Sequence, residues 1–185
     1  MAAGQSGRPR ASSREVLAEA ACELFLERSF EATTVADITT RAGVSRSSFF
    51  NYFASKSDIL WAALDERLEA AARSLARPGA PVREILAGIT AGLTPDSLAL
   101  AIANADVMGV GDELERERAI RQAQLARAVA ERSREGTTRL RAEVVGAAAA
   151  GAVLAAVWQW ADAGAGRAAL SALVDEALDQ ALGPA

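Results

Sequence analysis

The sequence predicts an all-α fold, and three observations support this prediction. The 185 residues include only five prolines and are rich in alanine, a composition that favours helix. Apolar residues recur three and four positions apart through most of the chain, as they do along the buried face of a helix. No stretch of four or more β-branched or aromatic residues in alternation, the pattern of a half-buried strand, is present. We therefore expect about nine helices.

The chain begins with a small, polar and basic segment, residues 1–11, which contains Arg8 and Arg10. We expect a disordered tail or, alternatively, a basic arm that follows a nucleic-acid backbone or enters its minor groove. Ser12 and Glu15 then form a capping-box pattern at the start of the first helix. The buried face of that helix carries four apolar residues at helical spacing: Leu17, Ala21, Leu24 and Phe25.

Two short helices joined by a tight turn are predicted next. Thr34 and Asp37 form a second capping box, and Gly43 ends the first helix because glycine accepts the left-handed backbone. Ser45 caps the second helix. We expect three aromatic residues on its apolar side, namely Phe49, Phe50 and Phe53. Five polar residues can share its other side: Ser45, Arg46, Ser47, Ser48 and Asn51.

This layout is that of a DNA-reading helix–turn–helix, whose second helix presents polar side chains to the major groove. The alternative is an αα-corner in an ordinary helical protein. The order of residues narrows the choice. The segments TTVADI at 33–38, AGVS at 42–45, FFNYF at 49–53 and SK at 55–56 resemble the DNA-binding domain of TetR-family repressors, and the resemblance is specific over about residues 12–65.

The resemblance implies a TetR-like architecture, with a three-helix helix–turn–helix domain at 12–56 and a helical ligand-binding and dimerisation domain at 57–185. It also implies eight DNA-binding residues: Thr34, Ser45, Arg46, Ser47, Ser48, Asn51, Tyr52 and Lys56. Tyr52 and Lys56 match phosphate-contacting positions of the family. Phe50 departs from the family, because it stands where a tyrosine hydroxyl usually holds phosphate. Asn51 replaces a frequent basic residue.

Breakers rich in glycine and proline divide the second domain. We expect its helices over residues 56–76, 82–93, 94–108, 112–135, 138–163 and 169–182. Thr94 and Pro95 are expected as the N-cap and first residue of their helix. Residues 144–161 are nearly all apolar and long enough to span a membrane, but small side chains dominate and Gln159 interrupts them. We expect this helix to be buried within a protein that does not enter the membrane.

The resemblance further implies a homodimer in which the last two helices of each subunit form the contact. The expected interface residues are Gly146, Ala147, Ala150, Gly151, Leu154, Leu170, Leu173 and Val174. The alternative is that both helices belong only to the core of one subunit. A dimer would set two recognition helices about 34–36 Å apart, and it would therefore demand a palindromic double-stranded DNA operator.

The same resemblance implies a mostly apolar ligand pocket in the second domain. The candidates are Trp61, Ile102, Asn104, Met108, Leu125, Trp158 and Gln159, with Asp106 as an alternative polar contact. Each of them could instead be an ordinary core or surface residue. We expect an apolar or amphipathic small-molecule effector to tilt the helix over residues 56–76 and so release the operator. No cofactor is expected.

Other function classes are disfavoured by composition. The chain has no histidine and one cysteine, Cys22, which excludes serine–histidine and cysteine–histidine catalysis and argues against a metal site. Glu113 and Glu117 are best explained as a solvated face, so we do not expect an enzyme. Net charge is −4, although residues 1–60 hold seven basic and seven acidic residues.

Two alternatives to a transcriptional regulator remain, a helical enzyme and a helical interaction or lipid-carrying module without DNA binding. No charged-then-apolar leader opens the sequence, so a cytoplasmic protein is expected.

Overall fold

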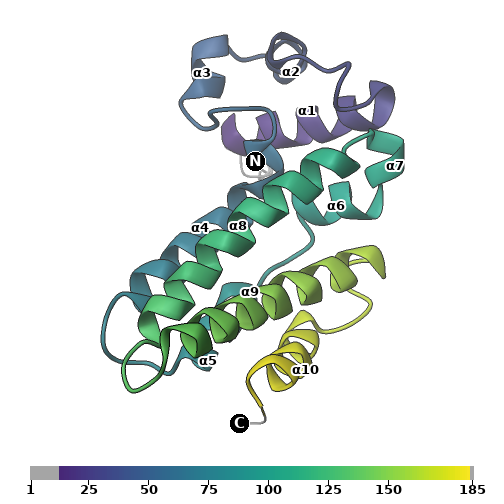
Figure 1. Ribbon diagram of the computed structural model, residues 1–185. Coiled ribbons are helices and arrows are strands. Elements are labelled where there is room, and N and C mark those ends of the chain that lie inside the picture. Colours follow the sequence, from purple (N-terminus) through teal and green to yellow (C-terminus); the bar gives the residue numbers. More distant parts are fainter. Residues whose placement is uncertain (1–12, 184–185) are drawn as a thin grey trace, which may run out of the picture.

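The computed structural model describes residues 13–183, and within that range the chain forms ten α-helices and no strand (Figure 1). The predicted arm at residues 1–11 and the predicted cap at Ser12 lie outside the described residues. In chain order the helices are α1 (Ser13–Arg28), α2 (Val35–Ala42), α3 (Arg46–Phe50), α4 (Asp58–Leu75), α5 (Val82–Thr90), α6 (Ser97–Ala103), α7 (Ala105–Met108), α8 (Gly111–Arg132), α9 (Arg139–Asp162) and α10 (Leu170–Leu182).

The first three helices form a small unit at one end of the molecule (Figure 1). The predicted apolar face of α1 is fully buried. A capping box starts α2, because the Thr34 hydroxyl accepts from the Asp37 amide at 3.2 Å and the Asp37 carboxylate accepts from the Thr34 amide at 2.9 Å. Gly43 ends the helix at a φ of 65°. Both local predictions are therefore confirmed.

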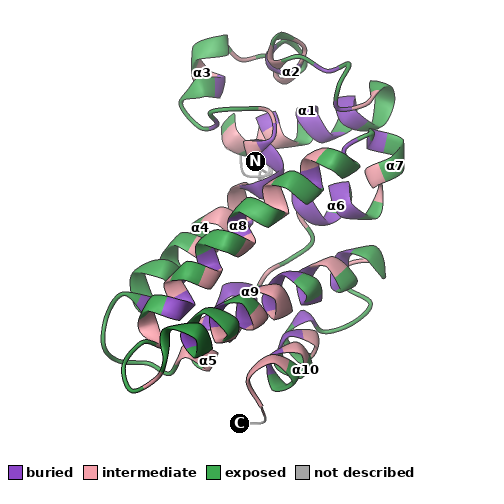
Figure 2. Ribbon diagram, in the orientation of Figure 1, coloured by how far each residue is buried: buried purple, intermediate pink, exposed green. Residues whose placement is uncertain are grey.

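The long helices α4, α8 and α9 form the body, α10 packs against α9, and α5 contacts both α4 and α10. The short helices α6 and α7 lie against α1 and so join the body to the first unit. Buried residues face inward along every long helix (Figure 2). One apolar core extends from Leu17 in α1 to Leu178 in α10. The first unit is therefore packed on the body rather than tethered to it.

Two predicted elements differ from the structure. The predicted helix at 94–108 is divided into α6 and α7, which accounts for ten helices rather than nine. The division falls at Asn104, whose φ of −125° and ψ of 27° are not helical. Its side-chain amide donates to the Leu100 carbonyl at 2.9 Å, a local bond that favours such a non-helical conformation. The N-cap of α6 is Asp96 rather than Thr94, and its carboxylate accepts from the Ala99 amide at 3.0 Å.

Helix α9 is the one described helix that is long and apolar enough to cross a membrane, by length and composition alone. In the structure it lies between α8 and α10, and ten of its residues are buried there. Gly146 permits the close approach to α8, because a Cβ at this position would stand 2.3 Å from the Ala126 carbonyl oxygen. The apolar residues of α9 thus pack against neighbouring helices of the same chain.

Candidate functional site

Helix α3 carries the polar surface that the sequence predicted for a recognition helix. Its N-cap, Ser45, accepts from the Ser48 amide at 3.1 Å, and its hydroxyl lies 2.8 Å from that of Ser47 and 2.9 Å from that of Ser48. Phe49 and Phe53 anchor the opposite side in the core, as predicted. This anchoring leaves the capped, serine-rich end of α3 accessible at the extremity of the molecule (Figure 1).

Phe50 corrects the prediction of three aromatic residues on the apolar side, because 49% of its surface is exposed. The Arg46 guanidinium lies over its ring, 5.7 Å from the centroid. Residues four apart are neighbours on a helix, so the spacing of these two could have indicated the pair. Tyr52 is also exposed, at 48%. The accessible surface of this segment therefore combines hydroxyl groups, one arginine and two aromatic rings.

Thr34 and Asn51, two further predicted DNA-binding residues, are also exposed. The Thr34 hydroxyl donates to the Asp37 carboxylate at 2.7 Å. Hydrogen bonds from the Thr34 hydroxyl and then from its amide hold the pKa of Asp37 below its usual value. A phosphate contact from Thr34 would therefore compete with its capping role.

Lys56 is placed differently from the other predicted contacts. Its Nζ donates to the Phe30 carbonyl at 2.6 Å and to the Thr33 carbonyl at 3.1 Å, and it lies 4.1 Å from the centroid of the Phe30 ring. The Phe30 amide in turn donates to the Met108 carbonyl of α7 at 2.7 Å. Lys56 thus fastens the loop between α1 and α2, and its role as a phosphate ligand stays a prediction.

Arg41 at the end of α2 is also engaged within the protein. Its guanidinium pairs with Glu23 at 3.1 Å and with Glu27 at 2.7 Å, both in α1. The hydrogen bonds that Arg41 donates, first to Glu27 and then to Glu23, raise the pKa of Arg41, and the bond to Glu27 lowers the pKa of that carboxyl group. Two carboxylates close to the helix–turn–helix are thereby neutralised, which reduces repulsion of an approaching polyanion.

The predicted ligand residues do not come together around one open pocket. Trp61, Ile102, Met108 and Leu125 lie in the core, whereas Gln159 is exposed. The structure does bring Trp61 and Trp158 together, with ring centroids 5.7 Å apart. A surface groove of about 700 Å³ that the sequence did not indicate lies between α1, α6 and the end of α9. None of the predicted ligand residues lines it.

The predicted dimer residues divide into two groups. Five are buried inside the chain and are not available to a second subunit: Gly146, Ala150, Leu154, Leu170 and Val174. Their small or apolar side chains pack α9 against α8 and α10, which is the alternative that the sequence left open. Ala147, Gly151 and Leu173 remain at least partly accessible. The accessible face of α9 also carries Leu140 and Val144, which are 72% and 59% exposed.

Two family models match separate parts of the chain. Residues 17–63 match the model of the bacterial regulatory proteins of the tetR family, and residues 111–183 match the model of the MftR C-terminal domain. A curated protein of Mycobacterium tuberculosis (strain ATCC 25618 / H37Rv), named as the mycofactocin biosynthesis transcriptional regulator MftR, is 38% identical over 55 residues. The match spans 30% of this chain and 28% of that protein.

Solved structures resemble the chain over most of its length. Thermus thermophilus FadR, a TetR-family repressor in complex with lauroyl-CoA, is 28% identical with a TM-score of 0.50, over 92% of this chain and 94% of FadR. A TetR-family regulator from Syntrophomonas wolfei is 16% identical with a TM-score of 0.55, over 91% and 92% of the two chains. A TetR-like regulator from Rhodococcus sp. RHA1 is 19% identical with a TM-score of 0.50, over 95% and 96%. These likenesses confirm the predicted fold.

Proposed function

Because the chain belongs to the tetR family of bacterial regulatory proteins, we propose that it is a dimeric transcriptional repressor that an apolar or amphipathic ligand releases from a palindromic operator. The observation that carries this proposal is the exposed polar surface of α3. A capped turn presents that surface, and buried Phe49 and Phe53 hold it in place.

The contacts follow from the chemistry of the exposed groups. We propose that Arg46 reaches a guanine edge or a phosphate, for which its guanidinium is suited. Ser45, Ser47 and Tyr52 would supply hydroxyl groups to the DNA backbone. The exposed Phe50 ring would add an apolar contact, for example with a thymine methyl group.

A gel shift on palindromic DNA from upstream of the gene and its neighbours tests the proposal. Arg46→Ala should weaken binding, by about 1–3 kcal/mol if the arginine reads a base. Arg73→Ala serves as the control. It removes an exposed charge near the C-terminal end of α4 and should leave the affinity for DNA nearly unchanged. A chain that shifts no duplex would support the alternative of a helical interaction or lipid-carrying module.

The effector we propose is amphipathic, with a long apolar chain. Support comes from the FadR likeness, because that protein was solved with lauroyl-CoA and is 28% identical to this chain. Isothermal titration of lauroyl-CoA, with coenzyme A alone as control, tests the class. The bound operator should be released at concentrations that saturate the protein.

We also propose that two copies associate through the accessible faces of α9 and α10. Leu140, Val144 and Ala147 lie three or four positions apart on α9, so they share one helical face. Two of these side chains are large, apolar and mostly exposed, which is unfavourable unless a partner covers them. Burial of this face in a dimer would place the two α3 surfaces at a fixed separation.

A further inference from the structure

We infer that Ser57 and Trp61 bind an uncharged carbonyl oxygen of the effector. The ligand would then be a ketone, ester, thioester or amide with an apolar chain, rather than a free acid. This inference rests on the proposed role of the second domain as an effector-binding domain, and it specifies the chemistry which that domain recognises.

The site consists of two buried polar atoms without a partner. The Ser57 Oγ and the Trp61 Nε1 lie in the interior, and neither has a hydrogen-bond partner among the described residues. Ser57 is 6% exposed and Trp61 is fully inaccessible. An unsatisfied buried donor costs about 1–3 kcal/mol, so two of them on one helix need an explanation.

The two groups face the same side of α4. Ser57 is the N-cap of α4 and already has helical φ and ψ angles, and Trp61 follows it by four residues. Side chains four apart on a helix share one face, and we infer from this that a single acceptor serves both groups. The indole N–H can only donate and the hydroxyl can also donate, so the missing partner is an acceptor.

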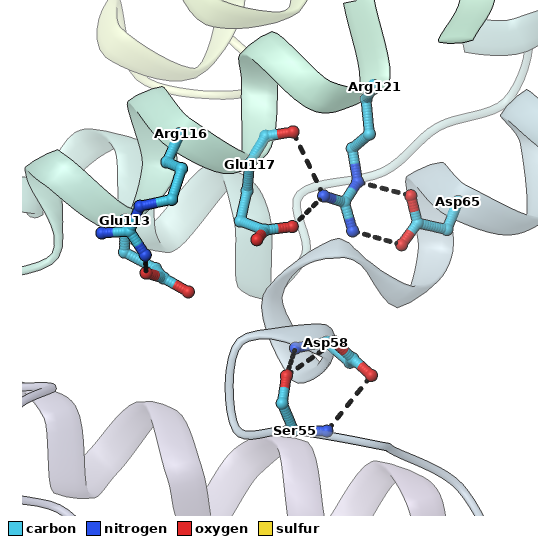
Figure 3. A network of polar contacts seen from close by, with 7 residues as sticks. All are labelled: Ser55, Asp58, Asp65, Glu113, Arg116, Glu117 and Arg121. Atoms are coloured by element: carbon cyan, nitrogen blue, oxygen red, sulfur yellow. Dashed lines mark hydrogen bonds and ion pairs between the residues drawn. The ribbon is translucent and has the colours of Figure 1, made fainter.

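The surrounding charges favour a neutral acceptor. The Arg121 guanidinium lies 4.2 Å from the centroid of the Trp61 ring. It donates two hydrogen bonds of 2.6 Å to Asp65, one to the Glu117 carboxylate and one of 3.2 Å to the Glu117 carbonyl (Figure 3). Burial disfavours the charge on Arg121, but its hydrogen bonds to Asp65 and Glu117 outweigh burial and raise its pKa. Arg121 is therefore committed to two carboxylates, and a buried carboxylate ligand would have to compete with them.

A route to Trp61 is provided by the residues stacked over it. The Trp158 ring lies 5.7 Å from that of Trp61, and the Arg118 guanidinium lies 4.4 Å from the centroid of Trp158. Both Trp158 and Arg118 are partly accessible. Displacement of these two side chains would open the site from the surface, between α8 and α9. The carbonyl of an entering ligand would then satisfy both donors, while its chain would occupy apolar surroundings.

Titration with 2-nonanone, followed by intrinsic tryptophan fluorescence and calorimetry, tests the inference without DNA. The background variant Trp160→Phe leaves Trp61 and Trp158 as the only indoles in the chain. Saturable binding is expected, and Ser57→Ala and Trp61→Phe should each weaken it roughly three- to tenfold, the effect of one net hydrogen bond. Nonanoate should bind at least about tenfold more weakly than the ketone, because its charge would be buried beside Arg121, which is already paired with Asp65 and Glu117.

Ser74→Ala is the matched control, because it makes the same change in α4 at a hydroxyl that already donates to the Ala70 carbonyl at 3.0 Å. It should bind 2-nonanone as the parent does. The thermal midpoint of Ser57→Ala should not fall, since the hydroxyl has no partner to lose, so weaker binding would not reflect misfolding.

Three results would each overturn the inference: no saturable binding of the ketone, unchanged affinity in both site variants, or equal affinity for nonanoate. A protein that binds the ketone but shifts no duplex would refute only the repressor.

Discussion

Asp37 and Asp96 each take part in a helix cap, and their carboxyl groups are perturbed in opposite directions. Hydrogen bonds from Thr34 lower the pKa of Asp37, whereas burial raises the pKa of Asp96, although its carboxylate accepts hydrogen bonds from the Ala99 and Leu98 amides. The charged form is therefore favoured at α2 and disfavoured at α6. Folding stability should respond to pH with opposite sign at the two positions.

Asp96→Asn exposes this difference. Asparagine caps helices about as well as aspartate but carries no charge to desolvate, so the variant should be more stable than the parent at neutral pH. The gain should be complete above the raised pKa of Asp96. It should disappear below the unfolded value of 3.8, where the parent carboxyl group is protonated in both states. Thermal midpoints measured from pH 7 to pH 3 give the comparison, and a gain that does not vary with pH would contradict this account.

Thr34→Ala removes one half of the capping box of α2. Unfolding free energy in urea should fall by about 1 kcal/mol, because the amide of Asp37 loses its acceptor. Thr40→Ala, at an exposed position of the same helix, makes the same chemical change without touching a cap and should have little effect. Equal losses in the two variants would show that threonine propensity, rather than the cap, matters.

Features that depend on neighbouring residues could be predicted from the sequence. The capping box at Thr34, the left-handed Gly43 and the burial of Phe49 each depend on a few adjacent residues, and all three are confirmed. Phe50 was placed wrongly because a run of aromatic residues does not say which members turn outward. The inward direction of Lys56 depends on Phe30, a residue 26 positions away, and no local pattern encodes that contact.

Lys56 joins the segment before α4 to the loop between α1 and α2, so its replacement should affect both stability and DNA binding. Lys56→Met should lower unfolding free energy by roughly 2 kcal/mol, because a charged donor to two carbonyl groups is lost. If Lys56 serves only this loop, operator affinity should fall with the salt dependence unchanged. If it also binds a phosphate, the slope of log affinity against log salt should decrease by about one unit. Affinity measured at several salt concentrations separates the two roles.

The contact between α8 and α9 leads to a prediction with an internal control. Gly146→Ala should destabilise the protein by about 1–3 kcal/mol, because the added methyl group would overlap the Ala126 carbonyl. Gly88→Ala in α5 adds the same methyl group where no atom beyond its neighbouring residues and its own helix backbone lies within 4 Å, and should stabilise by about 0.5–1 kcal/mol. Urea unfolding of both variants measures the difference, and a neutral Gly146→Ala would show that α8 and α9 can separate at little cost.

The extent of the helices was predictable only where the breakers were unambiguous. Helix α9 begins after Thr138 as expected, because a capping threonine follows a glycine turn. The stretch at 94–108 was expected as one helix, since its apolar periodicity continues through Asn104. The break there is a non-helical backbone at Asn104, accompanied by a side-chain hydrogen bond to Leu100. This is one of several conformations open to an asparagine.

At the scale of the whole molecule, the proposed dimer can be tested on its exposed face. Val144→Glu should convert a dimer to a monomer in sedimentation velocity, because a carboxylate would be buried at the contact. Val107→Glu is the matched control. Val107 is 63% exposed, much like Val144 at 59%, but it lies on α7, outside the proposed interface. A parent chain that is monomeric at all concentrations, or a dimer that survives Val144→Glu, would refute this interface.

The dimer surface shows the limit of reasoning from periodicity. Gly146, Ala150 and Leu154 share an apolar face of α9, and the sequence cannot tell whether that face meets the same chain or another one. The structure buries all three within the chain, while Leu140 and Val144 on the neighbouring face are exposed. Prediction of the effector site has the same limit. A tryptophan that packs in the core and one that lines a pocket can occupy the same positions in a helical pattern.

The uninterrupted core from α1 to α10 also constrains how relatives of this protein can exchange parts. The Phe30 amide donates to the Met108 carbonyl, and the core is continuous across this contact. A unit of α1 to α3 transferred to another regulator would therefore need α6 and α7 of that regulator to fit against it. Chimeras that keep α1 to α3 together with their own α6 and α7 should be functional. Chimeras that separate them should fold poorly or no longer respond to their inducers.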